Sequence, residues 1–428
     1  MGVDCEGKFG YIRENLVGIA HRGSTGNSFF HNFRSLQFCI MKNLFWLLGL
    51  CLFTSILVAQ TPFNIRVTNS IADQVMKGQY QVSDYVPTNV ISDPDEMVCF
   101  INENVSPDSL KAYLAKLESF HNRNTWADTL SLTTGIGAAR VWIHEHFERV
   151  SANNEDRLLA SYLQFDLGAG AACGAGRFKN IFGILPGLDP NDNSLIIIEA
   201  HMDSRCEDEC DVTCLAAGTD DNGSGTALVM ELARVMSQLS FDHSIVFMAT
   251  VGEEQGLLGA DAFAKYCQDN SVPIKAVQNN DVVGGIYCGN TASPPTNCTE
   301  EGMIDSLQLR VFSFGNINSA NKGFARFTKT VYTEKLKPIV TVPITLSLMQ
   351  PEDRTGRGGD HIPFRQRGFT AIRFTEAHEH GHGDPSAPGY SDRQHTSRDI
   401  LGHDTDGDQE LDSLFVDFNY LADRKSVV

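Results

Sequence analysis

The sequence predicts an α/β fold in which a mostly parallel or mixed central β-sheet is flanked by helices. Short, continuously apolar runs recur along the chain, as expected for strands buried on both faces. Segments with apolar residues at helical spacing separate these runs. This alternation is typical of parallel strands joined by helical crossovers. Sheets of this kind bind ligands beyond the carboxyl ends of their strands.

Two helices are predicted before the strands of the sheet. Residues 106–123 begin with Ser106, which can cap a helix, and apolar residues then recur at helical spacing up to Phe120. Residues 137–150, GAARVWIHEHFERV, form the second predicted helix. The preceding segment, residues 60–105, is of mixed character. A leader, a pro-segment and an edge element of the sheet all remain open for it.

The strands and helices then alternate. A strand pair is predicted at 158–167 and 178–187. The segment SLIIIEA (194–200) is a predicted buried strand, and an amphipathic helix at 224–239 follows it. A second buried strand, HSIVFMAT (243–250), is followed by a helix at 256–267. Two shorter strands are predicted at 276–281 and 370–376.

Composition and charge narrow the class of protein. The chain has 428 residues, of which 42% are hydrophobic and 20% charged, as expected for one large domain or two small ones. Its 53 acidic and 34 basic residues give a formal net charge of −19. Such a surface repels nucleic acid, so we expect no nucleic-acid partner.

A secretion signal is predicted inside the printed sequence. Lys42 follows Met41, an apolar run extends from Leu44 to Val58, and the small residue Ala59 offers a cleavage site. The run is short for a transmembrane helix, although an internal membrane anchor is the alternative. We therefore expect a secreted, extracellular or periplasmic protein without a stable membrane anchor after cleavage. The predicted organisation has four parts. Residues 1–40 are an extension that results from a wrongly assigned start of translation, and residues 41–59 are a signal peptide. Residues 60–105 are an N-terminal segment, and residues 106–428 are a catalytic domain.

The cysteines fit an exported protein. Of 11 cysteines, eight lie after the predicted signal peptide, and an even number suits disulfides. Cys288 and Cys298 flank a proline-rich loop and are the predicted pair. Disulfides are also expected in CEDECDVTC (206–214), because no histidine or fourth cysteine there completes a zinc-finger spacing.

Polar side chains of particular types follow the predicted strands. They are His201, Asp203, the adjacent pair Asp220 and Asp221, the adjacent pair Glu253 and Glu254, Asp281 and, late in the chain, His395. Imidazole nitrogens and carboxylate oxygens are ligands that zinc prefers. Two histidines and three carboxylates can hold two zinc ions if one carboxylate bridges them. One member of the aspartate pair can be that bridge, while the other shapes the turn.

The adjacent glutamates suggest a division of labour. One of Glu253 and Glu254 would bind metal, and the other would take a proton from an attacking water. A metal ion and a carboxylate base that act together in this way are typical of an amide hydrolase. Asp203 lies two residues after His201 and can accept the second N–H of that imidazole, as carboxylates near ligand histidines often do.

Five motifs in this order resemble the M28 zinc metallopeptidases, which include secreted bacterial leucyl-type aminopeptidases. The motifs are EAHMDS, GTDDNGSG, VGEEQGLLGA, NND and QHTSRD, between residues 106 and 425. The resemblance implies a zinc-exopeptidase (phosphorylase/hydrolase-like) architecture with two Zn²⁺ ions per chain. It implies metal ligands at His201, Asp220, Glu254, Asp281 and His395, with Asp220 bridging. It further implies that Glu253 is the general base, that Asp203 supports His201, and that a cis peptide joins Asp220 to Asp221.

One segment departs from the family pattern, and other segments carry residues that the five motifs do not include. GRGGDHIPF (356–364) is similar to a family stretch near the site, but Gly359 replaces the usual serine. For stabilising the oxyanion, Tyr390 and Arg357 are the candidates. The loop with His378, His380 and His382 is expected to be solvated, with substrate contact or an extra metal as alternatives. Acidic residues alternate in HDTDGDQELD (403–412), which makes Ca²⁺ a weaker prediction because the full EF-hand pattern is missing.

The predicted function is that of a secreted two-zinc aminopeptidase acting on peptides with a free N-terminus. A dipeptidase or carboxypeptidase of the same family is an alternative. A glutaminyl cyclase is another, although the ligands for two metals are all present here. A non-catalytic binding domain on the same scaffold is the third, and the complete ligand set with Glu253 argues against it.

Overall fold

The computed structural model describes residues 61–428, apart from 290–295, 355, 378–382, 409, 427 and 428. The chain divides into two units, Met1–Val58 and Ala59–Val428, and the fold described here is that of the second. The predicted extension (1–40) and signal peptide (41–59) lie outside the described residues. Among the described helices, none combines the length and the apolar character needed to cross a bilayer.

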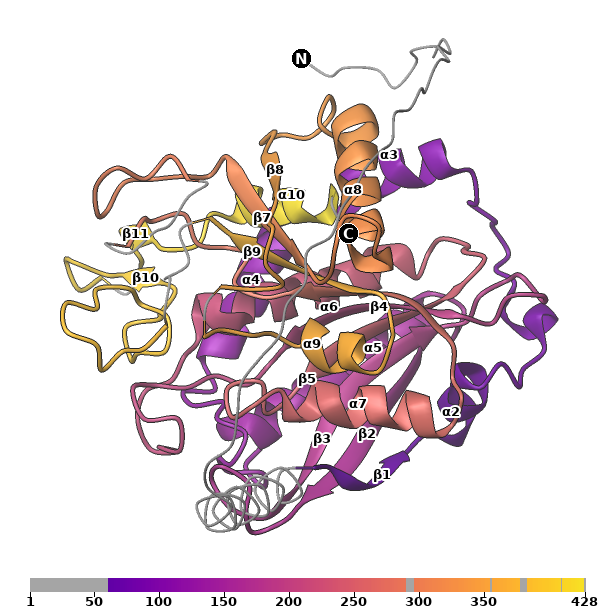
Figure 1. Ribbon diagram of the computed structural model, residues 1–428, viewed down its shortest axis with the longest axis horizontal. Helices are drawn as coiled ribbons and strands as arrows, with labels where there is room; N and C mark the ends of the chain where they lie inside the picture. Colours follow the sequence, from indigo (N-terminus) through magenta and orange to yellow (C-terminus); the bar gives the residue numbers. More distant parts are fainter. Residues whose placement is uncertain (1–60, 290–295, 355, 378–382, 409, 427–428) are drawn as a thin grey trace, which may run out of the picture. The chain divides into compact units, whose positions relative to one another are not determined.

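A nine-stranded mixed sheet forms the centre of the second unit, in the order β1-β2-β3-β5-β4-β6-β9-β7-β8 (Figure 1). The strands are β1 (Phe63–Val67), β2 (Leu159–Leu167), β3 (Gly176–Leu185), β4 (Leu195–His201), β5 (Ser244–Thr250), β6 (Ile274–Asn280), β7 (Gln308–Ser313), β8 (Thr345–Leu348) and β9 (Ala371–Glu376). Strands β5, β4, β6 and β9 run parallel to one another, and β1, β2 and β3 extend the sheet in antiparallel fashion. At the other edge, β7 is antiparallel to β9 and parallel to β8.

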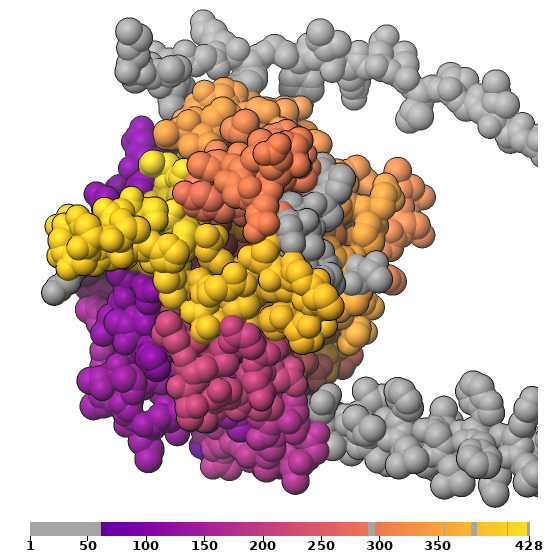
Figure 2. All heavy atoms as spheres, turned by 90° about the vertical axis from the view of Figure 1, so that its left-hand side faces the viewer, coloured from indigo at the N-terminus to yellow at the C-terminus, as the bar shows by residue number. Residues whose placement is uncertain are grey.

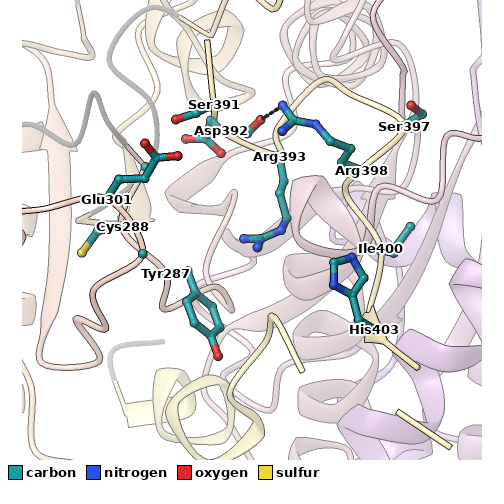
Figure 3. Close-up of a pocket in the computed structure, with 12 residues that line it drawn as sticks. Tyr287, Cys288, Glu301, Ser391, Asp392, Arg393, Ser397, Arg398, Ile400 and His403 are labelled. Carbon is teal, nitrogen blue, oxygen red and sulfur yellow. Dashed lines mark hydrogen bonds between the residues drawn. The ribbon is translucent and has the colours of Figure 1, made fainter. Parts of the chain in front are cut away.

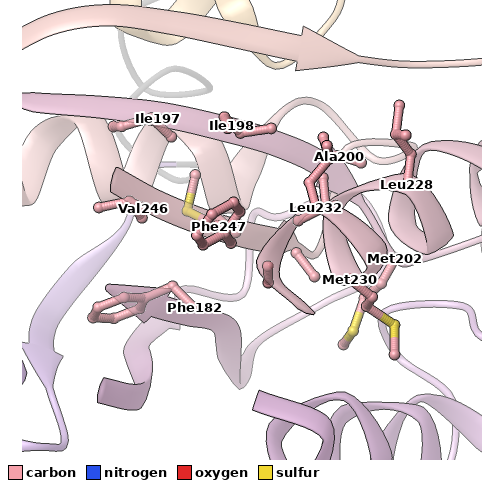
Figure 4. Packing of buried hydrophobic residues seen from close by; sticks show 14 of the residues in the cluster. Phe182, Ile197, Ile198, Ala200, Met202, Leu228, Met230, Leu232, Val246 and Phe247 are labelled. Atoms are coloured by element: carbon pink, nitrogen blue, oxygen red, sulfur yellow. The ribbon is translucent and has the colours of Figure 1, made fainter. Parts of the chain in front are cut away.

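The parallel centre of the sheet explains the apolar runs in the sequence. All seven residues of β5 are buried, and β4 is buried except for partial exposure of Ile196. Figure 4 shows side chains of β4 and β5 packed with those of a neighbouring helix, α6 (Gly225–Met236). Strands covered on both faces need apolar residues at consecutive positions, so the predicted strands at 194–200 and 243–250 are confirmed.

Helices cover both faces of the sheet. Helices α4 (Pro107–Glu118), α5 (Gly135–Asn153) and α6 pack together, with α5 on β2 and β3 and α6 on β4 and β5. Helix α7 (Leu258–Asp269) packs on β1 and β3, and α9 (His361–Gln366) packs on β6, β9 and α7. Figure 1 shows α7 and α9 in front of the sheet. Helix α8 (Ala320–Val331) lies on β7, β8 and β9. The short α10 (Phe418–Asp423) contacts α4.

The N-terminal segment belongs to this fold. Strand β1 pairs with β2 and is the edge strand of the sheet. Helices α2 (Ser70–Met76) and α3 (Pro94–Asn104) follow it, and three residues of α2, Ala72, Val75 and Met76, are fully buried in the core. Ser106 caps α4 as predicted by accepting a hydrogen bond from the N–H of Ser109 at 3.2 Å. A leader, a pro-segment and an edge element were the three roles left open for residues 60–105. The position of β1 at the edge of the sheet agrees with the last of these.

Candidate metal centre

Acidic and imidazole side chains meet where the parallel strands end. His201 is the last residue of β4, Glu253 and Glu254 follow β5, and Asp281 follows β6 directly. Because these strands are neighbours and parallel, their carboxyl ends lie at one edge of the sheet. His201 Nε2 lies 3.5 Å from an Asp281 oxygen and 4.0 Å from a Glu253 oxygen. The structure thus brings these side chains close together, as the strand-end argument from the sequence predicted.

The structure places Asp221, and not Asp220, in the middle of this cluster. One Asp221 oxygen lies 3.2 Å from His201 Nε2, and the other lies 3.2 Å from His395 Nε2. His395 Nε2 is also 3.3 Å from a Glu254 oxygen. The Asp221 carboxylate therefore lies between the two histidines, His201 and His395.

The prediction of Asp220 as the bridging ligand disagrees with this geometry. An Asp220 carboxylate oxygen accepts hydrogen bonds from the N–H groups of Gly284 and Gly285, at 3.1 and 3.0 Å. The side chain thus faces the loop after Asp281 and holds it in place. The predicted position of the cis peptide is wrong as well, since it joins Asp221 to Asn222.

Buried groups around the turn fix the position of Asp221. The carboxylate of Asp399 accepts hydrogen bonds from the N–H groups of Asp220 and Asp221, at 3.0 and 2.9 Å. The buried guanidinium of Arg123 donates to the carbonyls of Met202 and Gly218, both at 2.9 Å. Burial lowers the pKa of Arg123 to about 10, although nearby carboxylates raise it, so it stays charged at neutral pH. Asp399 belongs to the QHTSRD motif, but nothing in the sequence assigned it this role.

Asp203 supports both the histidine and the glutamates. His201 Nδ1 lies 3.1 Å from the main-chain carbonyl of Asp203 and 3.6 Å from its carboxylate. The carboxylate itself accepts from the Thr125 hydroxyl at 3.1 Å and from the N–H groups of Glu253 and Glu254 at 3.4 Å. Asp203 therefore leaves His201 Nε2 directed at the site and holds the turn that carries both glutamates.

A buried arginine that the sequence analysis missed holds Asp281. Arg373 of β9 lies 3.1 Å from an Asp281 oxygen, and it donates to an Asp353 oxygen and to the Gly358 carbonyl, both at 2.8 Å. A Cβ on Gly359 would come within 3.0 Å of the Arg373 side chain. The glycine found where the family pattern has serine thus leaves room for this arginine. An arginine inside the apolar strand TAIRFTE was the available signal.

Burial and charge set the ionisation of the cluster. Burial raises the pKa of Glu253 and of Glu254 well above the ordinary value, and neighbouring carboxylates act in the same direction. Burial opposes the charging of His201, but the surrounding carboxylates, Glu253 first, raise its pKa well above the ordinary value. Hydrogen bonds from both histidines lower the pKa of Asp221, although burial opposes this. Clusters of such shifted groups are typical of functional sites.

The donor set fits metal ions. His201 Nε2 and one oxygen of Glu254 are buried without a hydrogen-bond partner among the described residues. Ligand atoms of His201, Asp221 and Glu254 lie within 4.8 Å of one another, and so do those of His201, Glu253 and Asp281. Several carboxylates at such separations repel one another, and burying charge without compensation is costly. Divalent cations would relieve both costs, and zinc takes this mixture of nitrogen and oxygen ligands.

The cluster opens into a cavity of about 380 Å³. Apart from the acidic residues and His395, the lining includes three arginines, namely Arg205, Arg357 and Arg373. Of the two oxyanion candidates, Arg357 lines this cavity. Tyr390 is not among the lining residues, and its hydroxyl donates to the Gln394 carbonyl at 2.7 Å.

A second cavity, of about 360 Å³, lies beside the C-terminal loops and shares no lining residue with the first (Figure 3). Arg393 points into it, with its guanidinium 3.5 Å from the ring centre of Phe415 and 5.6 Å from that of Tyr287. Arg398 donates to the carbonyl of Asp392 at 2.7 Å. No predicted metal ligand lines this cavity.

The disulfide predictions are confirmed. Cys288 is bonded to Cys298. The segment 206–214 contains the disulfide Cys206–Cys214, and a third disulfide joins its Cys210 to Cys173. The C-terminal segment lies against this disulfide-bonded loop, where the N–H and hydroxyl of Ser397 donate to Glu207 at 3.3 and 3.2 Å (Figure 2).

The structure tests neither of the two weaker metal predictions, which are calcium at 403–412 and an extra metal at the histidine-rich loop. Carboxylate oxygens of Asp404, Asp406 and Asp412 lie within 4.8 Å of one another, but all three residues are exposed, so calcium stays a prediction. The loop with His378, His380 and His382 lies outside the described residues.

Comparison with known proteins identifies the family. The sequence profile of peptidase family M28 matches residues 180–302. A probable zinc metalloprotease of Leptosphaeria maculans is 30% identical over 68% of this chain and 69% of the relative. One of Phaeosphaeria nodorum is 30% identical over 67% of this chain, which spans 61% of that relative.

Solved structures agree on the fold. The aminopeptidase LapA of Legionella pneumophila superposes with a TM-score of 0.52 at 18% identity, over 80% of this chain and 74% of LapA. LapB of the same organism gives a TM-score of 0.53 at 18% identity, over 84% and 78%. The fold, together with the identity to probable zinc metalloproteases, defines a metallopeptidase. The chain belongs to peptidase family M28.

Proposed function

We propose that this protein is a secreted two-zinc aminopeptidase that removes N-terminal residues from peptides. The observation that carries the proposal is the position of Asp221, with one oxygen 3.2 Å from each of the two histidines. A carboxylate placed in this way can join two metal ions.

Each predicted ion would have its own ligands. His201 and Asp281 would hold the first ion, Glu254 and His395 the second, and Asp221 both. This set differs from the sequence prediction by the exchange of Asp220 for Asp221. When bound, zinc supplies a Lewis acid for the scissile carbonyl and acidifies the attacking water.

The residues of the chain perform the proton transfers and the positioning. Glu253 is 13% exposed at the edge of the cluster, and its raised pKa suits a group that takes up a proton and releases it again. In the proposed reaction its carboxylate accepts the proton that water loses and delivers it to the leaving amine. Asp203 keeps Glu253 in position by accepting its main-chain N–H at 3.4 Å.

Secretion is part of the proposal. The segment 41–59 supplies the signal, and three disulfides are typical of proteins that leave the reducing cytoplasm. A dipeptidase or carboxypeptidase would use the same metal centre on a different substrate, so substrate tests must separate them.

The deciding experiment incubates the protein of residues 60–428 with two peptides of one sequence, one with a free N-terminus and one acetylated. Mass spectrometry reads the products, with and without chelator and zinc add-back. Stepwise loss of residues from the free peptide alone, abolished by chelator, supports the aminopeptidase. Removal of residues from the other end, or cleavage of dipeptides only, would contradict it while keeping the metal chemistry.

A further inference from the structure

The second cavity has two walls that local bonds hold in place. One wall comes from the segment that the Cys288–Cys298 disulfide crosslinks. The other wall is the turn of residues 391–400. In this turn the carbonyl of Arg393 accepts hydrogen bonds from the N–H and the hydroxyl of Thr396, at 3.1 and 2.6 Å. A cavity between such walls is largely formed before a ligand arrives, as small-molecule sites usually are.

Arg393 brings a positive charge into this cavity (Figure 3). Its guanidinium lies 3.5 Å from the ring centre of Phe415 and 5.6 Å from that of Tyr287, so two aromatic rings orient it. Burial lowers the pKa of Arg393, while Asp392 and Asp399 raise it from beyond ion-pair distance. Among the described residues, none forms an ion pair with this guanidinium or accepts a hydrogen bond from it. Stacking on a ring leaves the N–H groups in the plane of the guanidinium available to another molecule.

The lining of the second cavity carries charges of both signs. Arg393 and Arg398 line it together with the acidic residues Glu301 and Asp392. The Nη2 group of Arg398 donates to the main-chain carbonyl of Asp392 at 2.7 Å, which fixes the direction of that side chain (Figure 3). A multiply charged anion would be repelled by the acids of this lining. A zwitterion, which carries one charge of each sign, is complementary to both kinds of residue.

We propose that the second cavity binds a free α-amino acid, with its carboxylate on the guanidinium of Arg393 and its ammonium group toward Glu301 and Asp392. Guanidinium groups bind carboxylates through paired, charge-assisted hydrogen bonds. A cavity of about 360 Å³ is at the small end for ligand sites, which suits a single amino acid. The proposed reaction releases free amino acids, so its product would be the natural ligand. Only this last step rests on the proposed function.

This binding site is separate from the metal centre but shares a turn with it. Arg393 lies two residues before the predicted ligand His395. Asp399 of the same segment accepts hydrogen bonds from the N–H groups of Asp220 and Asp221, at 3.0 and 2.9 Å. A bound amino acid would therefore contact the segment that positions the metal ligands without occupying their cavity. Its binding should be measurable when the metal centre itself is blocked.

The test is calorimetric titration of the zinc-loaded protein of residues 60–428 with three ligands of similar shape. These are L-leucine, L-leucinol, which lacks the carboxylate, and N-acetyl-L-leucine, which lacks the ammonium group. Leucine is chosen because its apolar side chain can lie beside Ile400 and Tyr287, which line the cavity. Acetohydroxamate, a small chelating ligand of zinc, is present throughout to occupy the metal centre.

We expect one leucine to bind per chain in the presence of acetohydroxamate. Leucinol should bind about 10- to 100-fold more weakly, and Arg393→Gln should weaken leucine by a similar factor, since hydrogen bonds to charged groups contribute this much. Glu301→Gln changes an exposed side chain and should reduce the advantage of leucine over N-acetyl-leucine. Arg326→Gln removes an exposed charge from α8, outside the cavity, and should keep the full affinity. Zinc content and melting temperature establish that each variant is intact.

Several results would overturn the proposal. Absence of saturable leucine binding, or equal binding of leucine and leucinol, would exclude a site for the carboxylate. Unchanged affinity in a folded Arg393→Gln would place the bound leucine elsewhere, and if that variant does not fold, unchanged ligand preference in Glu301→Gln decides in the same way. Inorganic phosphate that binds more tightly than leucine and displaces it would make the cavity a general anion site instead. No peptide is cleaved in these titrations, so failure of the aminopeptidase assay and failure of this proposal remain distinguishable.

Discussion

Replacing each of the two adjacent aspartates with asparagine tests the assignment of the bridging ligand. Asp221→Asn removes one negative charge and one acceptor oxygen from a group that faces His201 and His395 at 3.2 Å each. Loss of a partner that merely orients a ligand already costs about 10- to 100-fold in metal affinity. For a ligand shared by two ions we expect at least about 100-fold, or about 2.7 kcal/mol.

Asp220→Asn is the matched control, because it makes the same chemical change one residue away. The amide oxygen can still accept the N–H groups of Gly284 and Gly285. For these two hydrogen bonds the added strength of a charged acceptor is lost, which is about 1 kcal/mol of folding stability. We therefore expect near-normal zinc content and a melting temperature lowered by a few degrees.

The assay is zinc retention after dialysis against a graded series of chelator concentrations, measured by elemental analysis beside circular dichroism. Asp221→Asn should release zinc at a chelator concentration at least about 100-fold lower than the wild type, with its fold retained. The reverse order, in which Asp220→Asn loses zinc and Asp221→Asn keeps it, would refute the assignment and restore the prediction made from the sequence.

Three further predictions concern the base, the glycine and a buried histidine. Glu253→Gln should lower kcat by about 10²- to 10⁴-fold with zinc content unchanged, and loss of zinc would instead make it a ligand. Gly359→Ser should destabilise the fold by about 1–3 kcal/mol in chemical denaturation, because its Cβ would lie 3.0 Å from Arg373. Gly323→Ala on α8 is the control, since the nearest atom to its Cβ is 3.9 Å away, and an equal effect of both would exclude this steric cause. Burial lowers the pKa of His146 to about 4 from 6.5, so its neutral form stabilises the fold above pH 6.5. About 3 kcal/mol should be lost as pH falls from 6.5 towards 4, and His146→Phe should flatten that part of a pH series of unfolding free energies.

The sequence predicted the elements and site residues whose position follows from a simple periodic rule. Strands β4 and β5 appear as continuous apolar runs because both of their faces are covered. Since their carboxyl ends lie side by side, His201 and Glu253 could be brought together from sequence alone. Strands β1, β7 and β8 were not individually predicted. They lie at or next to the edges of the sheet. The edge strand β1 has only exposed and half-buried residues, and β8 has one buried residue, which weakens the apolar signal.

The choice between Asp220 and Asp221 could not be made from the sequence by the same rule. Adjacent residues in an irregular turn have no fixed period that says which side chain faces the sheet. The outcome depends on hydrogen bonds from distant segments, such as those that Gly284 donates and Asp399 accepts. The separation between Asp399 and Asp220 is 179 residues, and no local pattern carries that information.

Two arginines beside the site, Arg373 and Arg205, hold different parts of it, as their partners show. Arg373 lies between Asp281 and Asp353, so its charge is matched and it fixes the direction of one predicted ligand. A cation used in this way adds no field for a substrate, since the neighbouring acid cancels it. Arg205 donates hydrogen bonds to two carbonyls of a disulfide-bonded loop, and its guanidinium lies 3.7 Å from a carboxylate oxygen of Glu209. A rigidly held charge beside a metal centre weakens metal binding. The acidic neighbours, Glu209 for Arg205 and Asp353 for Arg373, reduce that cost at both positions.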